Sequence, residues 1–114
     1  MHELGIVFHI IKQVKDVAIE NNAKSVRSVT LDIGEVSLII PSYLEDCWNW
    51  AVKKEDIMQD CKLICNVIKA KTYCEDCQNI YDTVTYGKIC PNCHSAHTYL
   101  KIGSEVEIRE ISVV

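Results

Sequence analysis

Apolar residues recur at helical spacing near the start of the chain. They fall at Leu4, Val7, Phe8, Ile11, Val14 and Ala18. Residues three and four apart share one face of an α-helix, so this pattern predicts a helix from Leu4 to about Asn21 with one buried side. The Asn21-Asn22 pair favours an end of the helix at that point.

A strand and a second helix are predicted next. Apolar and polar residues alternate from Val29 to Ile33, which indicates a strand with one buried face that ends at Gly34. Pro41 then opens a helix, because proline suits the first helical turn. The apolar stripe of this helix is formed by Leu44, Cys47, Trp48, Ala51 and Val52, with Trp50 off the stripe.

Two further strands frame an insertion in the second half of the chain. Residues 63–70 are rich in β-formers, and residues 105–109 alternate between apolar and polar. The last strand needs a partner to bury its apolar side, so we expect it to pair with the earlier strands. The prediction is an α+β fold of two helices packed on a small three-stranded mixed sheet. Residues 1–70 and 103–114 form one discontinuous domain, and residues 71–102 form the inserted domain.

The insertion contains two cysteine pairs, Cys74-x2-Cys77 and Cys90-x2-Cys93. Two such pairs at this spacing are typical of a four-thiolate metal site, most often tetrahedral zinc. Residues 82–87 are expected to form the tip of a hairpin that returns the second pair to the first. Disulfides or an iron centre are the alternatives. Because four sulfurs leave no position for a substrate, we interpret the zinc as structural, in a zinc-ribbon module.

Composition excludes several classes of protein. The chain has 114 residues, 48% of them hydrophobic, and a formal net charge of −4. An acidic chain argues against nucleic acid and anionic membrane surfaces as partners. No segment is long and apolar enough to span a bilayer, and the start lacks the basic region of a signal peptide. The chain has seven cysteines, four of them at metal-binding spacing, which indicates a reducing cytoplasm. Cys61 and Cys65 are interpreted as core or edge residues.

The first three residues, Met1-His2-Glu3, offer a second candidate metal site. The terminal amine of Met1, the His2 amide nitrogen and the His2 imidazole can form adjacent chelate rings. The Glu3 amide or another imidazole could fill a fourth position. Such a planar set of nitrogens suits Ni(II) or Cu(II), although from spacing alone a histidine at position 2 is usually incidental.

Two histidines, His94 and His97, follow the last cysteine closely. Each is either a reserve zinc ligand, a group that supports the ligands by hydrogen bonding, or a solvent-exposed side chain. On acidification, one of them could replace a cysteine ligand and move the zinc module about its hinge. X-ray absorption at the zinc edge would then no longer show four sulfur ligands.

Four segments together resemble the HypA/HybF family, the nickel metallochaperones of [NiFe]-hydrogenase maturation. They are Met1 to Leu4, Leu31 to Glu35, the two cysteine pairs with His94-Ser95, and Gly103 to Ile108. These segments run in order from one end of the chain to the other. Paired cysteine motifs are common in zinc proteins, but their combination with an N-terminal Met-His-Glu is specific.

The resemblance implies a nickel domain with His2 as the main side-chain ligand and Glu3 as its essential neighbour. It implies a separate zinc domain held by the four cysteines. It also implies docking with a HypB-type GTPase and delivery of nickel to the large subunit of [NiFe]-hydrogenase. Some relatives carry an acidic residue in the loop before the second helix. Residues 37–41 have none here, and Glu35 is only a distant candidate.

The resulting hypothesis is a carrier of Ni²⁺ and not an enzyme, with Zn²⁺ as a structural ion. We expect a monomer or a dimer that swaps the inserted module. A zinc ribbon that binds nucleic acid is the first alternative, but Glu75, Asp76 and Asp82 offset the lysines near the ribbon. The second is a rubredoxin-like electron carrier, which would be red. Urease maturation is a further role assigned within the family, and nothing in the sequence decides it.

Overall fold

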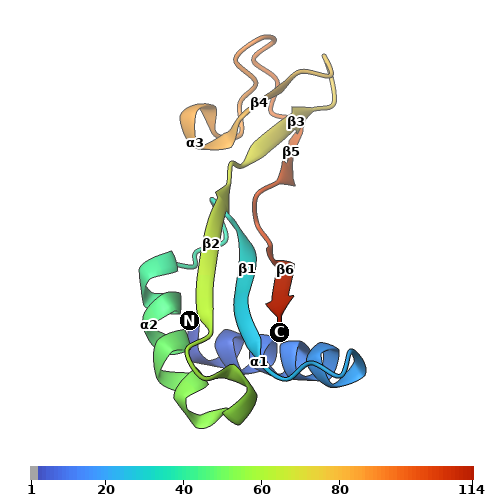
Figure 1. The fold of residues 1–114 in the computed structure, drawn as a ribbon. Coiled ribbons are helices and arrows are strands. Elements are labelled where there is room, and N and C mark those ends of the chain that lie inside the picture. The colour runs from blue at the N-terminus through green and yellow to red at the C-terminus, as the bar shows by residue number, and fades with distance from the viewer. Residues whose placement is uncertain (1–2) are drawn as a thin grey trace. The chain divides into compact units, whose positions relative to one another are not determined.

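The computed structural model describes residues 3–114, and Figure 1 shows its elements. The helices and strands are α1 (Glu3–Glu20), β1 (Val26–Gly34), α2 (Pro41–Ala51), η1 (Val52–Lys54), η2 (Asp56–Met58), β2 (Lys62–Ile68), β3 (Lys71–Cys74), β4 (Ile80–Asp82), α3 (Thr83–Tyr86), β5 (Thr98–Ile102) and β6 (Val106–Val113). The chain divides into two compact units. The first holds residues up to 32 with 39–66 and 107–114, and the second holds residues 33–38 and 67–106.

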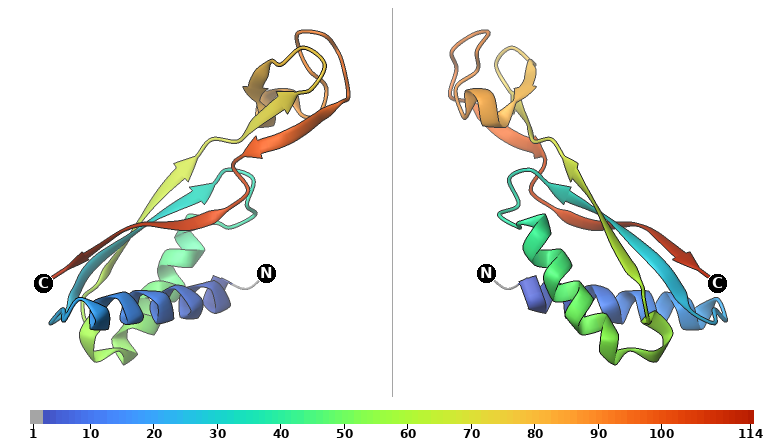
Figure 2. Two further views of the ribbon diagram at one scale, coloured as in Figure 1. Left: turned by 90° about the vertical axis from the view of Figure 1, so that its right-hand side faces the viewer. Right: turned by 60° about the vertical axis from the view of Figure 1, so that its left-hand side comes forward.

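A three-stranded sheet joins segments that are far apart in the sequence. β1 lies between β2 and β6. The arrows of β1 and β2 run in the same direction and that of β6 runs in the opposite one, so the sheet is mixed (Figure 2). Because β2 and β6 both pair with β1, the cysteine module is inserted between two strands of one sheet. This confirms the predicted fold class.

Helix α1 buries one face, but that face is not the predicted one throughout. The buried residues are Val7, Ile10, Ile11, Val14 and Ala18. Leu4 and Phe8 were expected on this stripe, and both are exposed. The helix is rotated so that Ile10 takes the inner position, while the Phe8 ring meets the edge of the Trp50 ring at a centroid distance of 6.5 Å.

The end of α1 is as predicted. Asn22 adopts a left-handed conformation with φ of 54°, which asparagine tolerates better than most residues. The backbone N–H of Ala23 donates to the carbonyl of Ala18 over 2.9 Å, so one of the last helical carbonyls has a partner. The chain leaves the helix there and enters β1.

Helix α2 begins with Pro41 at its first turn, as expected. Leu44, Trp48 and Ala51 are buried, and the indole Nε1–H of Trp48 donates to the Cys61 carbonyl oxygen over 3.0 Å. Cys47 was predicted on the buried stripe but is only half-buried. It therefore lies at the border of the buried stripe, beside the fully buried Leu44, Trp48 and Ala51.

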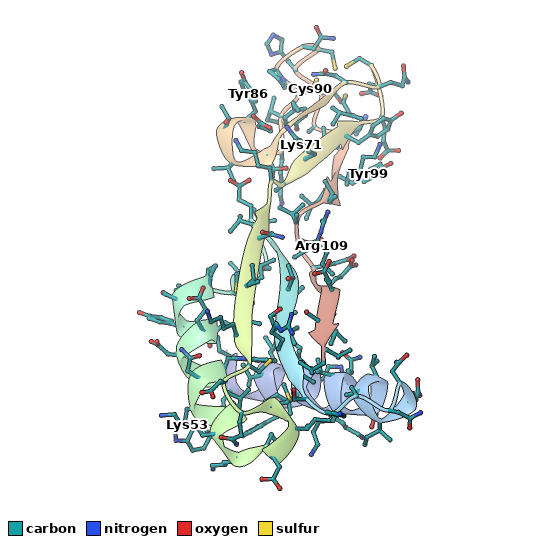
Figure 3. The ribbon with its side chains drawn as sticks, viewed as in Figure 1. Lys53, Lys71, Tyr86, Cys90, Tyr99 and Arg109 are labelled. Atoms are coloured by element: carbon teal, nitrogen blue, oxygen red, sulfur yellow. The ribbon has the colours of Figure 1, made fainter. Side chains whose placement is uncertain are left out.

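The second unit contains a sheet that the sequence did not predict. β3 is the central strand and pairs antiparallel with β4 and with β5. Lys71, labelled in Figure 3, lies on β3. It pairs with Asp82 of β4 in register and through an ion pair. The predicted loop tip at residues 82–87 is wrong, because Thr83–Tyr86 forms the short helix α3. The Tyr86 ring packs edge-on against Tyr81, which folds this segment back onto the unit.

Three segments of the second unit meet at Gly34, Ala70 and Gly103. A Cβ added to Gly34 would lie 2.1 Å from the Gly103 carbonyl oxygen. Gly103 has φ of 114°, and a Cβ there would lie 2.4 Å from the Cα of Ala70. The Val36 N–H donates to the Gly103 carbonyl over 2.9 Å. Both glycines are therefore required by close backbone approach, and Gly103 also by its backbone conformation.

Candidate metal centre

Each cysteine pair lies on a tight turn, and the two turns have the same hydrogen-bond pattern. In the first, the N–H of Gln78 donates to the Cys74 carbonyl, and the N–H of Cys74 donates to the Asn79 carbonyl, both over 2.9 Å. In the second turn, the N–H of His94 donates to the Cys90 carbonyl over 2.9 Å, as Gln78 does to Cys74 in the first turn. Gln78 and His94 are both left-handed, with φ of 60° and 62°.

The second bond of that pattern also recurs, since the N–H of Cys90 donates to the Ser95 carbonyl over 3.0 Å. Each turn therefore closes over its first cysteine and directs the sulfurs of the pair to one side. The backbone alone brings two thiols of each pair together before any ion is considered.

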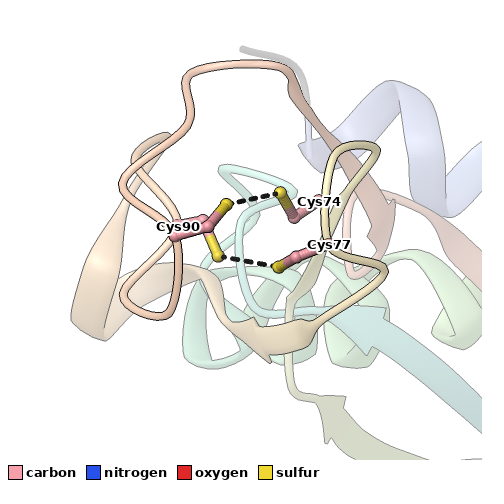
Figure 4. A group of neighbouring side chains, drawn as sticks. Cys74, Cys77 and Cys90 are labelled. Carbon is pink, nitrogen blue, oxygen red and sulfur yellow. Dashed lines mark hydrogen bonds between the residues drawn. The ribbon is translucent and has the colours of Figure 1, made fainter.

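The four sulfurs converge on one point. Their Sγ atoms all lie within 4.8 Å of one another. The Sγ atoms of Cys74 and Cys93 are 3.5 Å apart, and those of Cys77 and Cys90 are 3.6 Å apart (Figure 4). Four sulfurs bound at ~2.3 Å to a tetrahedral ion would lie about 3.8 Å apart. The donor set and its spacing therefore fit a tetrahedral ion, as the sequence predicted for these cysteines.

The four thiols differ in exposure. Cys74 and Cys90 are fully buried and pack with Tyr81. Cys77 is half-buried and Cys93 is exposed. The Tyr81 hydroxyl donates to the Gly87 carbonyl over 2.9 Å, so this buried ring has its polar atom satisfied. The centre therefore has a buried side, formed by Cys74 and Cys90, and an exposed side at Cys93.

Two side-chain amides donate to sulfur across the pair of turns. Asn79, which follows the first pair, donates to Cys90 over 3.8 Å. Asn92, which lies within the second pair, donates to Cys77 over 3.5 Å. N–H groups directed at sulfur stabilise the thiolate over the thiol. Neither asparagine could be predicted as a donor, because nothing in the order of residues indicates which sulfur an amide will reach.

The pKa values of the cysteines respond to this environment. Burial raises the pKa of Cys90, but hydrogen bonds from the backbone N–H groups of Cys93 and Asn92 and from neighbouring side chains outweigh it, and the pKa falls to about 6. At Cys93 a backbone hydrogen bond from Ser95 lowers the pKa, yet desolvation and hydrogen bonds with the other thiols raise it to about 12. Four negative sulfurs so close together need a cation to offset their repulsion.

A polar clasp, defined as Asp76, Ser95 and His97, joins the two cysteine turns. The Asp76 carboxylate accepts from the Ser95 hydroxyl, and His97 Nδ1 lies 3.1 Å from the same carboxylate oxygen. The N–H of His97 donates to the Ser95 hydroxyl over 3.0 Å. The Ser95 bond, followed by that of His97, holds the pKa of Asp76 below its usual value. His97 is therefore engaged at the surface, and His94 is exposed beside Cys93.

The predicted nickel ligands fall at the other end of the chain. Met1 and His2 lie outside the described residues, whereas Glu3 is the first residue of α1 and is half-buried. Glu35, the distant acidic candidate, uses its carboxylate to accept the Ala70 N–H over 3.0 Å. This contact gives Glu35 a structural role within the second unit. None of the helices in residues 3–114 is long and apolar enough to cross a membrane.

Comparison with known proteins gives the class first. A family model described as "Hydrogenase/urease nickel incorporation, metallochaperone, hypA" matches residues 1–113. The class is therefore that of metallochaperones for nickel incorporation, and the chain belongs to the HypA family. This confirms the resemblance that the four sequence segments indicated.

Individual relatives agree with this assignment. The chain is 30% identical over 114 residues to hydrogenase maturation factor HypA of Rhizobium leguminosarum bv. viciae, covering 100% of each. It is 39% identical over 77 residues to the Aquifex aeolicus HypA, an alignment that covers 68% of this chain and 66% of that protein. The solution structure of the Ni metallochaperone HypA from Helicobacter pylori shares the fold, with a TM-score of 0.74 at 23% identity, covering 100% of this chain and 98% of the other.

Proposed function

We propose that this protein is a carrier that binds Ni²⁺ through Met1, His2 and Glu3 and delivers it during [NiFe]-hydrogenase maturation. The observation that carries the proposal is the match of the HypA family model to residues 1–113. An amine, amide nitrogens and an imidazole at the chain start would supply a nitrogen-rich set suited to Ni(II). The nickel-binding domain would comprise residues 1–70 and 103–114.

Zn²⁺ is the proposed resident ion of the domain formed by residues 71–102, with Cys74, Cys77, Cys90 and Cys93 as its ligands. The four sulfurs lie within 4.8 Å of one another, which suits a closed tetrahedral site. The ion would supply cross-linking of two turns and no open position for chemistry. A closed site supports the proposed role of a carrier over that of an enzyme. The exchange of a cysteine for His94 or His97 on acidification stays a prediction.

The proposed partners are those that the family resemblance implies, a HypB-type GTPase and the large subunit of [NiFe]-hydrogenase, in the cytoplasm. One observation disfavours the nucleic-acid alternative. The Lys71 ammonium group is neutralised by the Asp82 carboxylate, so it is not free to bind a phosphate. The rubredoxin alternative uses the same four sulfurs and differs only in the ion. Metal analysis of colourless protein would exclude iron.

The decisive experiment replaces His2 with Ala in protein that keeps its authentic, untagged N-terminus. We expect stoichiometric nickel binding to be lost while zinc content stays at one ion per chain. His9→Ala is the matched control, because His9 is an exposed histidine on the same terminal segment. Nickel uptake by the His2 variant equal to that of the unmodified protein would overturn the site assignment. Size-exclusion chromatography with light scattering would separate the monomer from the swapped dimer.

A further inference from the structure

The four sulfurs of the candidate zinc site are not equivalent. Cys74 and Cys90 are fully buried, Cys77 is half-buried, and Cys93 alone of these four is exposed. Cys93 also lies in a stretch, residues 91–94, that is exposed throughout. Solvent and small molecules therefore reach the cluster from the side of Cys93.

The side-chain amides add to this asymmetry. Asn79 and Asn92 donate to Cys90 and Cys77, so each cysteine turn supports a sulfur of the other. Within residues 3–114, these are the side-chain amides that contact the cluster, and neither is directed at Cys74 or Cys93. A hydrogen bond to a metal-bound thiolate withdraws charge from sulfur and lowers its nucleophilicity. Cys74 lacks such an amide but is shielded by burial.

Among the four cysteines, Cys93 alone combines an exposed position with the lack of a side-chain amide donor. It receives a backbone hydrogen bond from Ser95, whereas the Ser95 hydroxyl donates to Asp76. The clasp of Asp76, Ser95 and His97 therefore holds the two turns together without using the Cys93 sulfur. Loss of the bond between the ion and Cys93 would leave the buried Cys74, the two sulfurs that accept amide hydrogen bonds and the clasp in place.

We propose that Cys93 is the sulfur at which the metal centre opens, being the first to leave the ion and the first to react with a thiol-directed electrophile. This inference rests on the proposed zinc site. It makes the second cysteine turn the reactive one and the sulfurs of Cys74, Cys77 and Cys90 the permanent frame. It also assigns Asn79 and Asn92 as positioning residues that keep their two sulfurs on the ion.

The chemistry of opening is balanced with N-ethylmaleimide as the electrophile. The Cys93 sulfur donates an electron pair to the alkene carbon and forms a C–S bond. The alkene electrons move to the neighbouring carbonyl as an enolate, which then takes a proton from water. The sulfur becomes a neutral thioether, a weak zinc ligand, so the Zn–S bond at this corner is lost.

The experiment treats the zinc-loaded full chain with less than one equivalent of N-ethylmaleimide. Modified cysteines are located by peptide mapping over time, while a colorimetric chelator follows zinc release. We expect Cys93 to be modified first among the four, with zinc release following that modification. Burial raises the pKa of Cys61 and of Cys65 to about 11, so these two thiols should react slowly near neutral pH.

Different failures are distinguishable in this experiment. First modification at Cys74, Cys77 or Cys90, or equal modification of all four, would overturn the inference while leaving the zinc site intact. Purified protein that contains no bound zinc would overturn the zinc site and the inference with it. Zinc release before any modification would also contradict the proposed order of events.

A variant tests the positioning role separately. Asn92→Ala removes the amide that donates to Cys77, so the alkylation rate of Cys77 should rise about fivefold, the size expected for one lost hydrogen bond. Asn49→Ala, at an exposed asparagine of α2, is the matched control and should leave all four rates unchanged. Equal alkylation rates at Cys77 in the Asn92 variant and the unmodified protein would show that the Asn92 amide does not protect this sulfur.

Discussion

The two units of this protein are stabilised by different kinds of interior. The first unit buries many large apolar side chains, among them Leu31, Leu44, Trp48 and Met58 at 0% exposure. In the second unit, the cluster around the candidate site consists of Cys74, Cys90 and Tyr81, with Cys77 packed against it. Two of the fully buried residues there are thus candidate metal ligands. We therefore expect burial of apolar side chains to fold the first unit, whereas the second should depend on a bound ion.

Removal of the metal is expected to have the largest effect. Structural zinc contributes about 10–16 kcal/mol in small zinc domains near pH 7, because binding and folding are coupled. A strong chelator should therefore unfold residues 71–102 while α1 and α2 keep their structure. Amide NMR spectra before and after chelation would check this, and added zinc should restore the lost signals. Loss of signals from both units together would mean that the first unit also depends on the ion.

Truncation of a core side chain in the first unit should destabilise that unit and leave the metal centre of the second unit intact. Trp48→Ala leaves a large cavity and removes the hydrogen bond to the Cys61 carbonyl, for a cost of about 3–5 kcal/mol. Zinc content should remain unchanged. Denaturant unfolding followed by helical circular dichroism would measure the cost. Trp50→Ala is the matched control, because Trp50 is exposed and should change stability by less than about 1 kcal/mol.

A methyl group at Gly103 should destabilise the second unit. Gly103→Ala combines φ of 114° with a Cβ 2.4 Å from the Ala70 Cα, and should destabilise the unit by about 2–4 kcal/mol. Gly87→Ala has a positive φ but no atom within 4 Å of the added Cβ, so it should cost only about 1 kcal/mol. Because folding and zinc binding are linked, competition with a chelator should rank the two variants. Equal zinc affinities would show that the Gly103 contact can relax.

The smallest expected effect concerns an ion pair of the first unit. Lys15 Nζ lies 2.6 Å from a Glu55 carboxylate oxygen, and this hydrogen bond raises the pKa of Lys15. A raised lysine pKa gives stability that is present below the unfolded pKa of ~10.4 and is lost as pH rises through the folded value. The Lys15 side chain is 41% exposed, so solvent screening limits the effect to below about 1 kcal/mol.

Unfolding free energies of the unmodified protein and of Lys15→Met, measured from pH 8 to pH 11, would check this contribution. The difference between the two proteins should shrink as pH rises. A constant difference over that range would mean that Lys15 acts through packing of its aliphatic stem and not through its charge.

Much of the fold was predictable because it follows from patterns of residues that are close together in the sequence. Pro41 fixed the start of α2, the Asn21-Asn22 pair marked the end of α1, and alternation located β1 and β6. The prediction failed where contact with a residue distant in the sequence decides the local structure. Phe8 fits the helical stripe by spacing, yet the rotation of α1 in the packed unit leaves it against Trp50. Thr83–Tyr86 reads as a polar loop, but packing of Tyr86 on Tyr81 folds it into α3.

The four sulfurs that converge could be predicted from the cysteine spacing, because two residues between paired cysteines set a turn whose geometry is local. The family could also be predicted from the sequence, since four short segments in order carry that resemblance. Packing in three dimensions makes Cys93 the exposed cysteine of the four and lets Asn79 and Asn92 donate across the turns. It likewise assigns Glu35 to the Ala70 backbone. Exposure and cross-turn contacts depend on how distant segments pack, which no local spacing encodes.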